Sequence, residues 1–189
     1  MIQEFRMRKH DATIFITDLG RPEGPVQLDS GDLYLVEMDD SRGCVSYIDA
    51  KTRSIRRLVK TGRPNGLARD ALGRIWIAES AIPSLLRMEQ DGSVTTVAVS
   101  GDGVPFIFPN DLAFGPDGML YMTDSGILSS DFVQNGAIRS DWATAPYNGK
   151  IFQINPANGN VSLIDDGFKF INGLAFSPEG LLYVNETIT

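Results

Sequence analysis

The sequence predicts an all-β fold, and three observations lead to this prediction. A sixteen-residue unit occurs four times without a gap, beginning at Glu23, Asn65, Asn110 and Asn172. Each copy has a glycine at its ninth position, which suits the tight turn of a β-hairpin. The residues around these turns alternate or form short β-branched and aromatic stretches, and nowhere does a 3.6-residue apolar period reach helical length.

The spacing of the repeats predicts how the strands are grouped. The four copies start 42, 45 and 62 residues apart, which is typical of stacked supersecondary units. Each copy supplies two strands joined at its glycine, and two weaker strands follow before the next copy begins. Four short antiparallel strands per repeat make one blade, so the sequence predicts a β-propeller of four-stranded antiparallel blades.

Residues 1–189 are expected to form a single, partial propeller domain. A six-bladed ring needs about 270 residues at roughly 45 residues per blade, so the chain supplies about three and a half of six blades. We therefore expect a fragment, a truncated product, or one part of an assembly that a partner chain or self-association completes. The predicted parts are a closing outer strand at 12–20, blade 1 at 23–60, blade 2 at 65–100, blade 3 at 110–166 with an insertion at 126–148, and the start of blade 4 at 172–189.

The first position of the repeat marks the expected functional face. It opens the innermost strand of each blade, and alternating strand directions place all four first positions at one mouth of the central channel. The insertion at 126–148 joins the second and third strands of its blade and belongs to the same face. Because it carries Phe132, Trp142 and Tyr147, we expect a lid over the mouth. The alternative is an insertion that packs only on itself.

Composition excludes several classes of function. The net charge of −7 argues against nucleic acid or an anionic membrane as a partner. No apolar run approaches the length of a membrane span, and the N-terminal residues lack a signal-peptide core, so a cytoplasmic protein is expected. The single histidine, His10, lies outside the repeats, and Cys44 is the single cysteine. A serine triad, a Cys–His pair or a histidine-based zinc site is therefore not expected.

The four first positions together predict a metal site. One carboxylate, Glu23, and the amide oxygens of Asn65, Asn110 and Asn172 are hard oxygen donors that converge on one axis. Such a set suits Ca²⁺, with Mg²⁺, Mn²⁺ and Zn²⁺ as alternatives, although zinc usually recruits nitrogen or sulfur donors. The other interpretation is that these side chains cap backbone amides in turns.

The repeats also resemble a known family. The stretches EGP at 23–25, PNG at 64–66, PND at 109–111 and NGLAFSPEGLLYV at 172–184 look like those of the gluconolactonase/regucalcin (senescence marker protein) family of six-bladed propellers, which includes diisopropyl fluorophosphatase as a relative. The resemblance covers the chain from about residue 14 to its end.

The resemblance implies roles for individual residues. Glu23, Asn110 and Asn172 match residues that hold a central divalent metal, usually Ca²⁺. Asn65, Asn110 and Asp111 match substrate-binding or pocket positions. Asp111 is similar to an acid that orients the metal ligands, and the alternative for it is an Asx turn.

The chain departs from the family at two places. The family's aspartate that binds metal and serves as base or nucleophile comes from a later blade, which is expected beyond Thr189, so no catalytic residue is assigned. Phe108 stands where gluconolactonase-like members often carry a sugar-binding arginine, which argues against a sugar-acid lactone.

The resemblance implies hydrolysis of a small-molecule lactone or ester, with the metal polarising the carbonyl and a carboxylate activating water. Three alternatives stay open. They are a phosphotriesterase-like hydrolase at the same site, a non-catalytic calcium-binding or structural propeller, and a strictosidine-synthase-like propeller, which needs a glutamate late in the chain.

Overall fold

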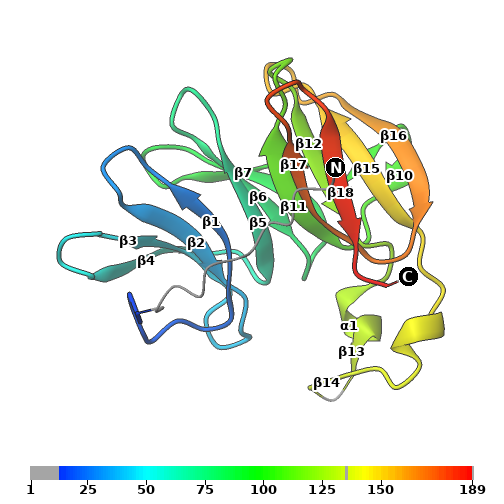
Figure 1. The fold of residues 1–189 in the computed structure, drawn as a ribbon, viewed down its shortest axis with the longest axis horizontal. Coiled ribbons are helices and arrows are strands. Elements are labelled where there is room, and N and C mark those ends of the chain that lie inside the picture. The colour runs from blue at the N-terminus through cyan, green and yellow to red at the C-terminus, as the bar shows by residue number, and fades with distance from the viewer. Residues whose placement is uncertain (1–12, 135, 189) are drawn as a thin grey trace, which may run out of the picture.

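The computed structural model describes residues 13–134 and 136–188, which consist almost entirely of antiparallel β-sheet (Figure 1). Three four-stranded sheets follow one another along the chain, and a two-stranded sheet follows them. Within each of these sheets the strands pair in chain order. The predicted architecture, a β-propeller of four-stranded antiparallel blades, is confirmed.

The strands of the blades are short. Those of blades 1 and 2 are β1 (Pro22–Gln27), β2 (Leu33–Glu37), β3 (Cys44–Ile48), β4 (Ile55–Lys60), β5 (Pro64–Arg69), β6 (Ile75–Glu79), β7 (Ser84–Met88) and β8 (Val94–Ala98). Those of blades 3 and 4 are β11 (Pro109–Phe114), β12 (Leu120–Asp124), β15 (Gly149–Ile154), β16 (Val161–Phe168), β17 (Ile171–Phe176) and β18 (Leu182–Glu186). Between blades 2 and 3 lies the small hairpin of β9 (Ser100–Gly101) and β10 (Val104–Pro105).

The innermost strands β1, β5, β11 and β17 pack against one another in chain order. Apolar side chains fill the space between neighbouring blades. Trp76 and Phe152 are fully buried in the cluster between blades 2 and 3, and Val36 and Ile77 in the cluster between blades 1 and 2. Full burial of each such side chain stabilises the fold by about 1.5–3 kcal/mol. This packing holds the innermost strands at a fixed spacing around the channel.

The acidic fifteenth position of the repeat has a structural role in every blade. Its carboxylate accepts a hydrogen bond from a backbone N–H that lies just before the innermost strand. These bonds join Gly20 N to Glu37 Oε2 (2.8 Å), Arg63 N to Glu79 Oε1 (2.7 Å), Phe108 N to Asp124 Oδ1 (3.0 Å) and Lys169 N to Glu186 Oε1 (2.5 Å). A buried N–H without a partner costs about 1–3 kcal/mol, so the carboxylates fix the segment that leads into each innermost strand.

The insertion at 126–148 contains short helical turns that the all-β prediction did not foresee. In the first turn, the carbonyl of Leu128 accepts hydrogen bonds from the N–H groups of Asp131 and Phe132 (both 2.9 Å). A single turn is too short to produce a 3.6-residue apolar pattern, which explains why the sequence did not reveal it. The elements of the insertion are α1 (Ser129–Phe132), β13 (Val133–Gln134), β14 (Ala137–Ile138) and η1 (Trp142–Thr144).

The strand predicted at 12–20 is absent from the described part of that segment. Residues 13–19 lie outside any strand, and residue 12 lies outside the described residues. Asp18 instead forms an ion pair with Arg42 of blade 1 (2.6 Å). Its φ of 65° interrupts an extended backbone, which accounts for the difference. The expected pairing of this segment with a last blade stays a prediction.

The structure describes one of the two residues that argued against histidine- or cysteine-based chemistry. His10 is outside the described residues. Cys44 is buried, and burial raises the pKa of its thiol, which disfavours the reactive thiolate. Among residues 13–134 and 136–188, no helix has the length and apolar character needed to span a membrane.

Candidate metal centre

A β-bulge lies near the start of the innermost strand in every blade. The strand register shifts between Glu23 and Val26, Pro64 and Leu67, Pro109 and Leu112, and Ile171 and Leu174. A bulge bends the strand and re-aims its side chains. Each bulge falls at or directly after the first position of the repeat, so the same local distortion acts on all four ring residues.

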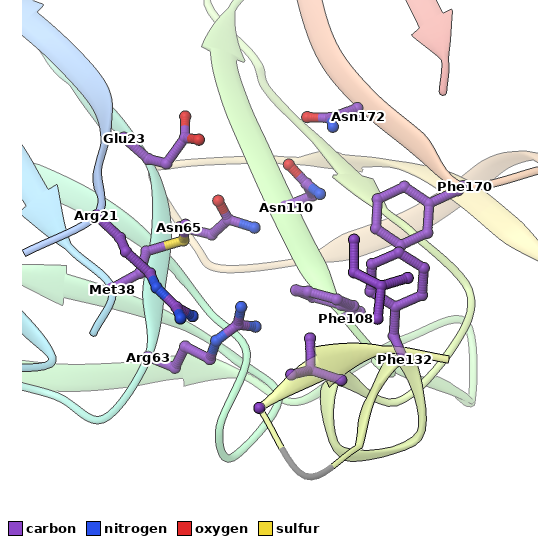
Figure 2. Close-up of a pocket in the computed structure, with 13 residues that line it drawn as sticks. Arg21, Glu23, Met38, Arg63, Asn65, Phe108, Asn110, Phe132, Phe170 and Asn172 are labelled. Carbon is purple, nitrogen blue, oxygen red and sulfur yellow. The ribbon is translucent and has the colours of Figure 1, made fainter. Parts of the chain in front are cut away.

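The four first-position side chains line the pocket shown in Figure 2 and also line a second cavity. The outer cavity has a volume of about 470 Å³ and is partly lined by the insertion, and the inner cavity has a volume of about 370 Å³. The residues that line both cavities are Glu23, Asn65, Asn110 and Asn172. The structure therefore brings together the four residues that the repeat places at the channel mouth, which we call the ring.

Hydrogen bonds orient the side chain of Asn110. Its Nδ2 donates to the Ser125 hydroxyl (2.8 Å), and that hydroxyl donates to the carbonyl of Ile171 on blade 4 (2.8 Å). A carbonyl can only accept, so the Ser125 hydrogen belongs to Ile171 and the Ser125 oxygen is left to accept from Asn110. The Oδ1 atom of Asn110 is consequently turned to the channel, where it is free to bind a cation (Figure 2).

Asn172 is anchored in the same way. Its Nδ2 donates to the hydroxyl of Thr187 (3.3 Å). Thr187 and Ser125 occupy the same position, the sixteenth, in their two repeats. Blades 3 and 4 thus each present an amide oxygen whose nitrogen is already engaged.

Asn65 lacks this anchor. The sixteenth position of its repeat is Ser80, whose hydroxyl donates to the carbonyl of Arg63 (2.9 Å), and among the described residues no hydrogen bond joins that hydroxyl to the Asn65 amide. The amide of Asn65 is therefore not oriented by its own repeat as the amides of blades 3 and 4 are. The sequence reasoning overlooked the sixteenth position, and its recurrent hydroxyl is the signal that could have revealed it.

The ring fits a hard divalent cation. Its donors are the carboxylate of Glu23 and amide oxygens, the ligand type that Ca²⁺ prefers. In the part of the chain that the structure describes, no group of three or more His, Cys, Asp or Glu side chains is placed to hold a metal ion. A metal at the ring would therefore depend on the Asn oxygens. The assignment of Glu23, Asn110 and Asn172 as ligands stays a prediction.

Asp111 occupies a position that is glycine in the other three repeats, Gly24, Gly66 and Gly173. A Cβ on Gly66 would lie 2.6 Å from the Asp111 Cα, so glycine permits the close approach of neighbouring innermost strands. The carboxylate of Asp111 accepts hydrogen bonds from its neighbour Leu112 N (2.9 Å) and from Leu174 N of blade 4 (3.2 Å).

Asp111 lines the inner cavity and not the outer one. Burial raises the pKa of its carboxyl. The bond from Leu174 N joins blade 3 to blade 4, the bond from Leu112 N lies within blade 3, and neither involves a ring side chain. Its expected roles in substrate binding and ligand orientation stay predictions.

The residue two positions before each ring residue lines the outer cavity. These residues are Arg21, Arg63, Phe108 and Phe170. Of these four residues, the sequence analysis singled out Phe108, because the repeat begins only at the ring residue. Reading each repeat two residues earlier, as RPEG, RPNG, FPND and FING, would have found them.

The insertion also lines the outer cavity, through Phe132, Val133, Gly136 and Ile138. The Phe132 ring lies 4.4 Å from that of Phe170, and the Tyr147 ring lies 5.8 Å from it. Trp142 is 48% exposed and does not line this cavity. Of the three aromatic residues on which the lid was predicted, Phe132 therefore lines the outer cavity, and Trp142 and Tyr147 do not.

Comparison with known proteins identifies relatives of this chain. Residues 21–189 match the family described as the SMP-30/gluconolactonase/LRE-like region. The chain is 34% identical over 127 residues to a gluconolactonase of Zymomonas mobilis, and 29% identical over 124 residues to Strictosidine synthase-like 3 of Arabidopsis thaliana. These matches cover 65% of this chain in both cases, 33% of the first relative and 31% of the second.

Solved structures of longer proteins share the fold. A gluconolactonase from Xanthomonas campestris has a TM-score of 0.71 at 23% identity, covering 88% of this chain and 55% of that one. Regucalcin, a calcium-binding protein from Agrobacterium tumefaciens, has a TM-score of 0.66 at 18% identity, covering 90% and 52%. At these identities the likeness shows the fold alone. The chain spans about a third of the curated relatives and about half of the solved structures.

Proposed function

Because the chain belongs to the SMP-30/gluconolactonase/LRE-like family, we propose that it serves in metal-dependent hydrolysis of a small-molecule lactone or ester. The observation that carries the proposal is the ring of Glu23, Asn65, Asn110 and Asn172 between the two cavities. The identity to a gluconolactonase supports the lactone as substrate. The cytoplasmic location predicted from the sequence is part of the proposal.

Each ring residue has a distinct task in this proposal. Glu23 supplies the negative charge for the cation, and Asn110 and Asn172 supply neutral oxygens whose amide nitrogens are held by hydroxyls. Ca²⁺ is the preferred ion, in keeping with the oxygen donors and with the calcium-binding protein of similar fold. When bound, a divalent cation polarises the lactone carbonyl as a Lewis acid.

The remaining residues of the mouth bind and shield the substrate. Asn65 is free to hydrogen-bond a substrate oxygen, since its amide is not anchored by Ser80. Phe108, Phe132 and Phe170 line the same cavity, so they exclude water from one side of the reacting group. Hydrolysis further needs a general base, and Glu23, the charged ligand of the cation, is not assigned that role. The aspartate expected beyond Thr189 stays a prediction for this role.

A second candidate function is calcium binding without catalysis. It is favoured by one observation: Glu23 is the one carboxylate among the ring residues, and both Asp111 oxygens accept backbone N–H groups. Such a ring could hold an ion and still lack a base for turnover.

Hydrolysis assays distinguish the two candidates. The purified chain is mixed with a panel of aldonolactones, acyl lactones and a phosphotriester, and acid release is followed with Ca²⁺ and with a chelator. Lactone turnover that disappears with the chelator and returns with Ca²⁺ is the expected result. Turnover of the phosphotriester alone would support the phosphotriesterase-like alternative.

The metal is measured separately on the same sample. Calcium binding without turnover would support the non-catalytic candidate and reject lactone hydrolysis by this chain. If the chain shows neither calcium binding nor turnover although its circular dichroism is that of a folded β-protein, both candidates are rejected.

A further inference from the structure

The outer cavity is divided into a cationic half and an aromatic half. The position two residues before the ring is arginine on blades 1 and 2 (Arg21, Arg63) and phenylalanine on blades 3 and 4 (Phe108, Phe170). Figure 2 shows the two guanidinium groups directed toward each other on one side of the cavity, and the phenylalanine rings gathered on the other. The same position of the repeat is therefore cationic on two blades and aromatic on the other two.

The cationic half is held without a carboxylate partner. Neither Arg21 nor Arg63 forms an ion pair with a described residue, and the buried Nη1 of Arg63 has no hydrogen-bond partner among them. Burial lowers the pKa of the Arg63 guanidinium and so does the charge of Arg21, whereas the charges of Asp40 and Glu79 act in the opposite direction. An unpaired buried donor is destabilising, and an anionic ligand group would supply the missing acceptor.

The aromatic half is a preformed apolar wall. Phe108 and Phe170 are almost fully buried, with ring centroids 5.9 Å apart in an edge-to-face arrangement. Phe132 of the insertion stacks on Phe170 at 4.4 Å. The guanidinium of Arg63 lies over the Phe108 ring at 5.5 Å, a distance at which a cation is attracted to a ring face. The two halves therefore meet directly.

The backbone supports a role in binding at this position. Arg21 has a φ of 51° and Phe170 a φ of 52°, in the left-handed region that side chains of this size avoid. Such strained conformations cluster at active sites and ligand-binding sites. One residue of each half is thus held in an unfavourable conformation that directs its side chain to the cavity.

We propose that the outer cavity recognises a lactone or ester that carries a carboxylate together with an apolar chain or ring. Arg21 and Arg63 bind the carboxylate through charge-assisted hydrogen bonds, and Phe108, Phe132 and Phe170 pack on the apolar body. The inference deepens the proposed function and rests on it for the reacting group. The carboxylate and the apolar body are recognised by this chain's own residues, whether or not turnover follows.

The charges that face the cavity predict a link to calcium. Glu23 lies in the same cavity as both arginines, and the exposed Asp40 lies with them in the adjoining one. Both carboxylates oppose an anionic ligand. A divalent cation at the ring would neutralise Glu23, so we expect the anion to bind more tightly when Ca²⁺ is present.

Calorimetric titration with three probes tests the inference. The probes are 4-phenylbutyrate, its neutral amide 4-phenylbutyramide, and acetate, each titrated into the 189-residue chain with and without Ca²⁺. We expect phenylbutyrate to bind at least about tenfold more tightly than either other probe, because the amide lacks the charge that strengthens hydrogen bonds to the arginines and acetate lacks the apolar body. Equal affinities for phenylbutyrate and its amide, or no detectable binding, would overturn the inference.

Variants locate the binding. Arg63→Gln should weaken phenylbutyrate binding by about tenfold or more, whereas the exposed Arg69→Gln on the same strand β5 should change it by less than about twofold. Circular dichroism and the melting temperature show whether the Arg63→Gln protein is folded. Full affinity in a folded Arg63→Gln protein would contradict the assignment.

The binding titrations and the hydrolysis assays together distinguish failure of the recognition site from failure of the proposed hydrolase. Arg63-dependent phenylbutyrate binding without lactone turnover would reject the hydrolase and keep the recognition site. Turnover that does not distinguish carboxylate-bearing lactones from their neutral analogues would keep the hydrolase and reject the recognition site.

Discussion

Blades 1 and 2 and blades 3 and 4 surround one channel mouth with the same repeat, yet they present different groups to it. The first pair contributes Arg21 and Arg63 to the outer cavity, and the second pair contributes Phe108 and Phe170. The ring residues differ in the same way. The Asn amides of blades 3 and 4 are each anchored by a hydroxyl, whereas Asn65 is not.

The comparison separates the positions that build a blade from those that equip the mouth. The ninth-position glycine and the fifteenth-position acid have the same role in all four blades, with φ values of 76–90° for the glycines and a backbone N–H bound to each acid. The positions that vary in chemistry lie two residues before the ring, at the first and second places of the unit, and at its sixteenth place. Chemical specialisation is therefore confined to the two ends of the unit.

The largest effect is expected from substituting the fifteenth-position acid, which has the same structural role in all four blades. Asp124 is fully buried and accepts hydrogen bonds from Ile107 N (2.7 Å), Phe108 N (3.0 Å) and Gly126 N (2.9 Å). Asp124→Ala leaves all three N–H groups without this acceptor, so we expect a loss of about 3–5 kcal/mol in the free energy of unfolding. Urea denaturation measures this loss.

Asp124→Asn serves as the matched variant, since it keeps a side-chain acceptor of the same size. It should destabilise less than the alanine variant. If Asp124→Ala lowers the free energy of unfolding by less than about 1 kcal/mol, the fifteenth position does not have the structural role assigned to it.

A smaller effect, on calcium affinity, should distinguish the anchored ring residue of blade 3 from the unanchored one of blade 2. Ser125→Ala removes the hydroxyl that orients Asn110, and we expect calcium affinity to fall by about tenfold, or about 1.4 kcal/mol. Ser80→Ala changes the equivalent hydroxyl on blade 2, which contacts the Arg63 carbonyl instead. It should leave the affinity within about twofold, and equal losses in both variants would abolish the distinction between the halves. Calorimetric titration gives both values.

The smallest effect concerns pH. Asp32 on blade 1 accepts hydrogen bonds from the Ser30 hydroxyl (2.6 Å), Ala50 N (2.8 Å) and the Tyr47 hydroxyl (2.7 Å), which lower its pKa from 3.8 to about 2. Its contribution to stability is therefore complete above pH 3.8 and is lost as pH falls toward 2. Burial instead raises the pKa of Asp124, which contributes with the opposite sign.

Asp32→Asn isolates the first of these contributions. Thermal melting of the variant and the unmodified chain should differ less at pH 2 than at pH 5, because protonation already removes the charge of Asp32 at low pH. A constant difference across this range would show that Asp32 does not titrate as the hydrogen bonds require.

Much of the fold was predictable because its determinants are local and repeated. The glycine turns and alternating strands around Gly31, Gly73, Gly118 and Gly180 predicted the hairpins, and four copies predicted blades. The helical turn of Ser129–Phe132 was not predictable, since one turn leaves no period to detect. The ring was predictable from strand direction alone.

The rest of the site depends on partners that a repeat alignment does not contain. The Ser125 hydroxyl accepts from the ring amide and donates to the Ile171 carbonyl of the next blade, whereas the Ser80 hydroxyl donates to the Arg63 carbonyl of its own blade. Likewise, Asp111 reaches Leu174 across the boundary between blades. Such contacts arise only when the blades stack, so the single-repeat pattern could not reveal them.

The ring as a calcium site is tested most directly by titrating Ca²⁺ into the unmodified chain and into Glu23→Gln. Removing the ring's one carboxylate should weaken calcium binding by at least about 100-fold, while the exposed Glu179→Gln in the turn between β17 and β18 should leave it unchanged. Equal calcium affinity in the unmodified chain and in a folded Glu23→Gln variant would contradict a metal centre at this ring.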